Sequence, residues 1–224
     1  MRLLCIETSS RRGSVVLAEG TRLVARATHS ELNAHAERLR ALLDQVLAEA
    51  GWSKHQLDRL GVGMGPGSFT GLRVGIAFAQ GIALGLDRPW IGAGSLEAMA
   101  AACPAEVGWP RVALLDARRD EIFAQAFAGA GRPEGIAEAL PRASGLASLA
   151  ERYPGAVFLG EIGPALGAPS VFRSETSDLP DAAGIAVLVA GRDPADSVRE
   201  PLYVRDSGAT PQNLPPSPIV RRAG

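Results

Sequence analysis

The sequence predicts an α/β fold with two lobes, each built on a mixed β-sheet flanked by helices. Segments with the patterns of strands are interleaved with segments of helical periodicity. The order in the first hundred residues is three strands, then helix, strand, helix, strand and helix. The chain has 224 residues, of which 46% are hydrophobic. That length allows two lobes of roughly 100 residues, each with a core.

The first lobe is expected to span residues 1–103. Its opening strands lie close together along the chain, which indicates an antiparallel meander. Asn33 is the expected N-cap of the first helix, Gly51 its stop, and Ser95 the N-cap of the third helix. Strands are predicted at 3–8, 14–19, 22–28, 59–63 and 89–91, and helices at 35–50, 71–86 and 95–102. Antiparallel strands followed by parallel ones are typical of a ribonuclease-H-like lobe of the actin-like superfamily, an analogy of fold alone.

Pro104 and Pro110 mark the boundary to a smaller C-terminal lobe, expected at residues 104–206. Its predicted elements are strands at 111–115, 122–127 and 156–159 and helices at 144–152 and 181–191. Residues 207–224 form a polar tail with several prolines, which predicts a flexible segment.

Charge and cysteine content limit the function classes. Basic and acidic residues number 23 and 24, a net charge of -1, which argues against autonomous nucleic-acid binding; a local arginine cluster could still touch RNA. Cys5 and Cys103 form no CxxC motif, which favours a reducing, cytoplasmic setting. The sequence shows neither a signal-peptide pattern nor an uninterrupted apolar run of membrane-spanning length, so no membrane association is expected.

The sequence lacks the motifs of several common enzyme classes, because its glycine, serine and histidine residues do not have the required spacing. The glycine-rich segment 65–73 contains neither a GxxxxGK[ST] phosphate loop nor GxGxxG, and Ser68 does not lie in GxSxG. His29, His35 and His55 form no HxxxH or HExxH pair, so we expect no metal site and no cofactor, and interpret these histidines as surface or interface residues.

Two carboxylates remain as candidates for chemistry. Glu7 and Asp116 each end the first strand of a lobe and would form a catalytic pair if they converged on one cleft. Each could instead cap a turn, Glu7 with Ser9 and Asp116 with Arg118. The structural role is the favoured interpretation, and we predict no catalytic residue.

The helix predicted at 71–86 is apolar on nearly all faces, whereas a helix on a small lobe should have a polar outer face. Small residues recur along it every four positions, which permits close helix approach. Some of its cover could come from the helix predicted at 35–50 and the rest from a partner subunit; alternatively, the second half of this chain buries it. The partner hypothesis predicts an interface of His35, Leu39, Leu42, Val46, Leu72, Gly75, Ile76, Phe78, Ala79 and Ala83.

The loop before this helix supports two interpretations. Its free amide groups at a helix N-terminus could hold an anion or lie beside a nucleotide, with Arg73 assisting. Alternatively, Gly-Pro-Gly only makes a tight strand-to-helix turn that Ser68 and Thr70 cap. The residues of the possible anion site are Gly65, Gly67, Ser68, Thr70, Gly71 and Arg73.

An ordered set of motifs resembles the TsaB (YeaZ-like) family. The most specific is GPGSFTGLR at 65–73, followed by the apolar helix. The others are CIETS at 5–9, HAERL at 35–39, IGAGSLEA at 91–98, DARR at 116–119 and PLYVR at 201–205. Glu7 replaces the family's usual Asp, and residues 129–195 carry few recognisable marks.

The resemblance implies an actin-like, two-lobe protein without a competent catalytic site. It would pair, through helices of its N-terminal lobe, with a TsaD paralogue that binds metal and substrate, and a TsaE ATPase would join the pair. That assembly transfers threonylcarbamoyl from its adenylate to an adenosine next to the tRNA anticodon. It further implies contact with tRNA only through the complex, and a possible homodimer in isolation.

Two other functions stay open at this point. The first is an autonomous actin-like ATP-dependent phosphotransferase that uses Glu7 and Asp116, and the second is a peptidase-like regulator.

Overall fold

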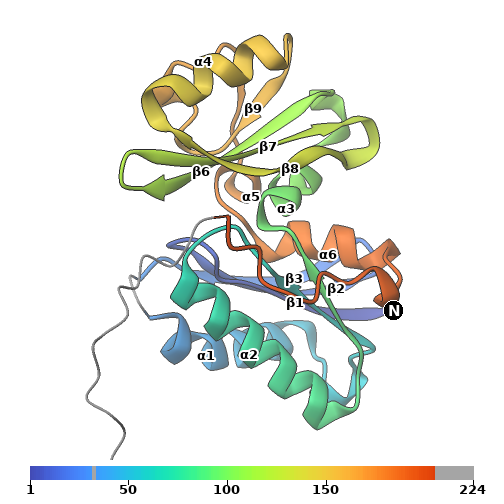
Figure 1. The fold of residues 1–224 in the computed structure, drawn as a ribbon. Coiled ribbons are helices and arrows are strands. Elements are labelled where there is room, and N and C mark those ends of the chain that lie inside the picture. The colour runs from blue at the N-terminus through green and yellow to red at the C-terminus, as the bar shows by residue number, and fades with distance from the viewer. Residues whose placement is uncertain (32–33, 205–224) are drawn as a thin grey trace, which may run out of the picture.

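The computed structural model describes residues 1–31 and 34–204, arranged in stacked layers (Figure 1). Two helices form one outer layer beneath the first sheet, and further helices lie between the first sheet and the second. One more helix covers the far face of the second sheet. The predicted arrangement of two mixed sheets flanked by helices is confirmed.

The first sheet holds five strands in the order β3-β2-β1-β4-β5. Its pairs from β3 to β1 are antiparallel, and those from β1 to β5 are parallel. The strands are β1 (Arg2–Glu7), β2 (Gly13–Glu19), β3 (Arg22–His29), β4 (Arg59–Gly63) and β5 (Trp90–Ala93). These match the predicted strands because each shows a local apolar pattern.

The second sheet repeats this plan in the order β10-β9-β6-β7-β8, with the pairs from β6 to β8 antiparallel and those from β6 to β10 parallel. The strands are β6 (Arg111–Arg118), β7 (Glu121–Ala128), β8 (Arg132–Pro141), β9 (Val157–Leu159) and β10 (Val171–Phe172). Strands β8 and β10 were not predicted. β8 contains Pro and Gly and is largely exposed, and β10 has only two residues, so neither shows a strand pattern.

Six helices flank the two sheets in the described part of the chain: α1 (His35–Ala50), α2 (Phe69–Leu86), α3 (Ser95–Ala102), α4 (Arg142–Arg152), α5 (Glu175–Asp178) and α6 (Ala182–Gly191). Helices α1 and α2 cover one face of the first sheet, and α6 covers the other (Figure 1). Helix α4 packs on the second sheet. The sequence predicts that α6 belongs to the second lobe. In the structure, α6 instead packs on the first sheet.

The helix ends confirm the predicted roles of Gly51 and Ser68 and correct those of Asn33 and Ser95. Gly51 ends α1 in the left-handed conformation with φ 65°, and the Ser68 hydroxyl caps α2, which begins two residues earlier than predicted. Ser95 is the first residue of α3 and Gly94 is its N-cap, because the Ser95 hydroxyl bonds elsewhere. The N-cap of α1 is Ala34 and not the predicted Asn33, which itself lies outside the described residues.

After α6, residues 192–204 run along the β5 edge of the first sheet. The Val198 amide donates to the Gly92 carbonyl over 3.2 Å, and the Leu202 amide donates to the Met64 carbonyl over 2.7 Å. This segment therefore covers an edge strand and ends beside the glycine-rich loop. The tail predicted to be flexible, residues 207–224, lies outside the described residues.

Candidate functional site

The glycine-rich loop and the start of α2 lie directly on the end of β1. A β-carbon on Gly71 would stand 2.1 Å from the Thr8 carbonyl oxygen, and one on Gly75 would stand 2.2 Å from Thr8 Oγ1. The Thr8 hydroxyl donates to the Gly71 carbonyl over 2.8 Å, and the Ser68 amide donates to the Ser9 carbonyl over 2.6 Å. Glycine is needed here because the two backbones approach more closely than any side chain would allow.

The outer side of the loop carries polar and aromatic groups. The Ser68 hydroxyl accepts from the Gly71 amide over 3.2 Å, which confirms its predicted capping role. Thr70 and Arg73 are exposed, and the Arg73 guanidinium lies 3.8 Å from the centre of the Phe69 ring. The need for glycine at position 71 is thus explained by close packing within the chain. The anion site at this loop stays a prediction.

Glu7, the last residue of β1, is fully buried where this strand meets the start of α3. The Ser9 amide donates to Glu7 Oε1 over 2.6 Å, and the Ser95 hydroxyl donates to Oε2 over 2.8 Å. A β-carbon on Gly63 would stand 2.0 Å from Oε2, so β4 leaves room for this carboxylate. Burial raises the pKa of Glu7, and the hydrogen bonds from Ser9 and Ser95 only partly oppose it. Glu7 therefore fastens the end of β1 to the start of α3.

Asp116 has separate partners at the tip of the β6–β7 hairpin. Its side chain is 45% exposed and accepts from the Arg118 amide over 2.8 Å and from the Arg142 guanidinium over 2.6 Å. The turn-capping roles favoured for Glu7 with Ser9 and for Asp116 with Arg118 are confirmed.

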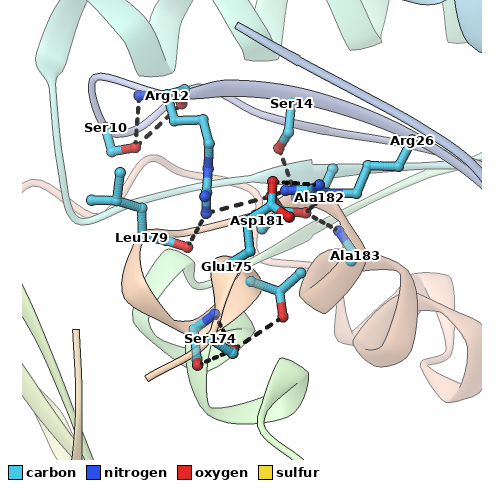
Figure 2. Close-up of polar contacts among 12 residues, drawn as sticks. Ser10, Arg12, Ser14, Arg26, Ser174, Glu175, Leu179, Asp181, Ala182 and Ala183 are labelled. Atoms are coloured by element: carbon cyan, nitrogen blue, oxygen red, sulfur yellow. Dashed lines mark hydrogen bonds and ion pairs between the residues drawn. The ribbon is translucent and has the colours of Figure 1, made fainter. Parts of the chain in front are cut away.

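A buried ionic network joins the β1–β2 turn to the start of α6 (Figure 2). Asp181 is fully buried and accepts two bonds from Arg26, over 3.2 Å and 2.7 Å, while Arg12 Nη2 lies 3.4 Å from its carboxylate. Arg12 also donates to the Leu179 carbonyl over 2.7 Å, and Arg26 pairs with the exposed Glu175 over 2.8 Å. The network fixes the chain where it returns from the second sheet to the first.

Sequence reasoning missed this network. Only Asp181 left a local signal, because an Asp directly before an apolar helical run is a typical N-cap, and its Oδ1 does accept from the Ala183 amide over 2.9 Å. Arg26 is separated from Asp181 by 155 positions, so their pairing depends on the complete fold. An exposed ion pair between Arg11 and Glu161 adds a second link between the β1–β2 turn and the second lobe.

The structure places most of the predicted partner-interface residues on the inner side of α1 and α2. Those packed in the chain's own core are His35, Leu39, Leu42, Val46, Leu72, Gly75, Ile76, Ala79 and Ala83, and Phe78 is half-buried. The surface that a partner could touch is therefore formed by their neighbours.

That surface is the outer side of α2. Leu84 is 85% exposed, and Ala77, Gly81 and Gly85 are exposed beside it. A groove of about 400 Å³ runs along this side, lined by Lys54, Ala77, Phe78, Gly81, Ile82, Gly85 and Leu86. Among the described residues, α2 is the one helix long and apolar enough to cross a membrane by length and composition, with a mean hydropathy of 1.4. Its inner side packs on the first sheet, so its apolar outer side is left uncovered within the described part of the chain.

The surface or interface role expected for the histidines holds for His55 but not for His35. His35 is buried and contacts the half-buried His29, whereas His55 is exposed. In the residues that the structure describes, no three His, Cys, Asp or Glu side chains are grouped so that they could hold a metal ion.

Comparison with known sequences gives a consistent set of relatives. The family model described as TsaD, tRNA N6-adenosine threonylcarbamoyltransferase, matches residues 22–149, more than half of the chain. The tRNA threonylcarbamoyladenosine biosynthesis protein TsaB of Escherichia coli (strain K12) is 39% identical over 126 residues, which cover 55% of this chain and 53% of that protein. The chain thus spans about half the length of the curated TsaB relatives it matches.

Solved structures agree with this. YeaZ from Pseudomonas aeruginosa superposes with a TM-score of 0.66 at 27% identity, covering 85% of this chain and 90% of YeaZ. The activator of the 2-hydroxyisocaproyl-CoA dehydratase from Clostridium difficile has a TM-score of 0.56 at 12% identity, covering 85% of this chain and 94% of the activator. That identity shows the fold alone, and the predicted two-lobe, actin-like fold is confirmed.

Proposed function

Because the chain belongs to the TsaD family and is a TsaB-like (YeaZ-like) member of it, we propose that it is a non-catalytic subunit of a tRNA-modifying assembly. In this proposal it pairs with a TsaD-type catalytic subunit in the cytoplasm, and a TsaE-type ATPase joins the pair. The assembly forms threonylcarbamoyladenosine next to the tRNA anticodon, and this chain meets tRNA only within the complex.

The observation that carries the proposal is the exposed apolar side of α2. Leu84 offers a large side chain to solvent, and β-carbons on Gly81 and Gly85 would meet nothing within 4 Å. An apolar strip with small residues allows a second helix to approach closely and gains free energy when it is covered. A helix from a partner subunit fits such a strip.

The polar groups of the chain support an accessory role over an independent phosphotransferase. Glu7 is buried behind Ser9 and Ser95, and Asp116 is paired with Arg142 at a hairpin tip. Arg12, in the β1–β2 turn, points inward to Asp181. Each of these groups already has a structural partner, so they do not converge on a substrate.

The test compares two exposed apolar residues in different lobes. Leu84→Arg changes the proposed surface, and Ile136→Arg, at a residue 83% exposed on β8, is the matched control. Size-exclusion chromatography with light scattering would measure each variant alone and with the TsaD-like protein of the same organism. We expect one-to-one pairing for the wild type and Ile136→Arg, and its loss for Leu84→Arg.

A stable complex with Leu84→Arg would contradict the proposed surface. A wild-type chain that stays monomeric with the TsaD-like protein would contradict the pairing itself. Circular dichroism would verify that both variants remain folded. Ile76→Arg is unsuitable because Ile76 is 9% exposed, and its charge would disturb the core.

A further inference from the structure

His29 and His35 contact each other where α1 begins. His29 ends β3 and His35 is the first residue of α1, and His29 Nε2 lies 2.9 Å from His35 Nδ1. His35 Nε2 lies 3.0 Å from the carbonyl oxygen of Ser10 in the β1–β2 turn. A β-carbon on Gly13 would stand 2.4 Å from His29 Nε2 and 2.8 Å from His35 Nδ1, so glycine makes room for the pair.

The geometry fixes where the hydrogens of the neutral pair lie. A carbonyl oxygen can only accept, so His35 Nε2 carries a hydrogen and donates to Ser10. His35 Nδ1 then accepts, and the hydrogen between the rings belongs to His29 Nε2. His29 Nδ1 is therefore unprotonated, and it is buried with no hydrogen-bond partner among the described residues.

Added protons do not fit this arrangement. With one proton more, three hydrogens occupy four ring nitrogens, and His29 Nδ1 must carry one without an acceptor whichever ring is charged. With two more, both facing nitrogens carry hydrogens at 2.9 Å, and the contact must open. Burial lowers the pKa of both rings, and the ring of His35 lowers the pKa of His29 further.

The charged side chains nearby do not offset the lowering of the two histidine pKa values by burial. Glu31 raises the pKa of His29 and Arg38 lowers it, and these two exposed side chains are paired with each other over 3.0 Å. In the β1–β2 turn, the Ser10 carbonyl accepts from His35 and raises its pKa, which opposes the effect of burial only in part, and β2 contributes Gly13, which has no side chain.

We propose that His29 and His35 form a proton-sensitive clasp, which holds the first turn of α1 against β3 and the β1–β2 turn when neutral and releases it on taking up two protons. Because an opened pair gains two protons together, release is steeper with pH than the titration of one histidine. The inference does not depend on the proposed partner.

Nitrogen NMR of the imidazole rings in the wild-type protein tests the hydrogen positions directly. At pH 7.5 we expect His29 protonated at Nε2 only and His35 protonated at Nε2 only. On acidification we expect both rings to gain protons in one joint step. Protonation of His29 Nδ1 at pH 7.5, or two separate independent titrations, would overturn the clasp.

Stability measurements test the number of protons. Urea unfolding between pH 6 and pH 5 would compare the wild type, H29Q, H35Q and the double variant H29Q/H35Q. Gln is chosen because its side-chain amide can still donate a hydrogen bond across the contact between positions 29 and 35. As long as the clasp stays closed in the folded state, we expect the wild-type folding constant to fall on the order of 50- to 100-fold over this unit relative to the double variant, and that of H29Q about tenfold. Equal falls for the wild type and H29Q would overturn the proposal.

Discussion

The carbonyl oxygen of Thr8 lies 2.1 Å from the point where a β-carbon on Gly71 would stand. We therefore predict that Gly71→Ala lowers the free energy of unfolding by about 1–3 kcal/mol, because β1 or α2 must move. Gly81→Ala in the same helix meets open space and should raise it by about 0.5–1 kcal/mol. Urea denaturation measures both, and equal effects of the two variants would show that the close approach is not limiting.

The second prediction concerns the buried carboxylate of Asp181. Asp181→Asn leaves the guanidinium groups of Arg12 and Arg26 without their shared charge partner, and we expect a loss of about 3–5 kcal/mol in the free energy of unfolding. Glu175→Gln, which changes a carboxylate 68% exposed and also paired with Arg26, should cost about 0–1 kcal/mol. A small effect of Asp181→Asn in thermal and urea unfolding would contradict the role of the network.

A third prediction follows from the raised pKa of Glu7. Since the folded state holds this proton more tightly than the unfolded chain, wild-type stability should fall as pH rises above the unfolded value of about 4.3. Glu7→Gln has no ionisable group at this position and avoids this loss. The stability of the variant relative to that of the wild type should therefore rise as the pH is raised from 5 to 8. Unfolding free energies at both pH values provide the measurement, with the exposed Glu37→Gln as control. A difference that does not change with pH would refute the assignment.

The fourth prediction concerns Arg111, which is 1% exposed at the start of β6. Its guanidinium donates to the carbonyls of Ala100 and Cys103 over 2.7 Å and 2.8 Å, and to that of Gly108 over 2.9 Å. Arg111→Lys keeps the charge but loses the planar fork, and we expect it to cost about 2–4 kcal/mol in calorimetric or urea unfolding. The exposed Arg132→Lys should change stability by less than about 0.5 kcal/mol, and comparable effects would argue against the fork.

Local sequence patterns were sufficient for most of the first lobe and for part of the second. The apolar runs of β1 and β2, the helical spacing of α1 and the stop at Gly51 were predicted and are confirmed. Within the site, the cap at Ser68 and the turn contacts of Glu7 and Asp116 were foreseen, because each partner lies two or three positions away. β8 gave no such signal, since its strand conformation comes from pairing with β7.

The sequence by itself determined which segments are apolar, where they begin and end, and which family motifs they carry. Only the tertiary structure decided which side of α2 is covered, because a helix that is apolar all round carries no mark of its inner face. The tertiary structure also brought Asp181 to Arg26 and placed His29 Nε2 against His35 Nδ1. Such contacts depend on how strands and helices pack in space, and no local periodicity encodes that packing.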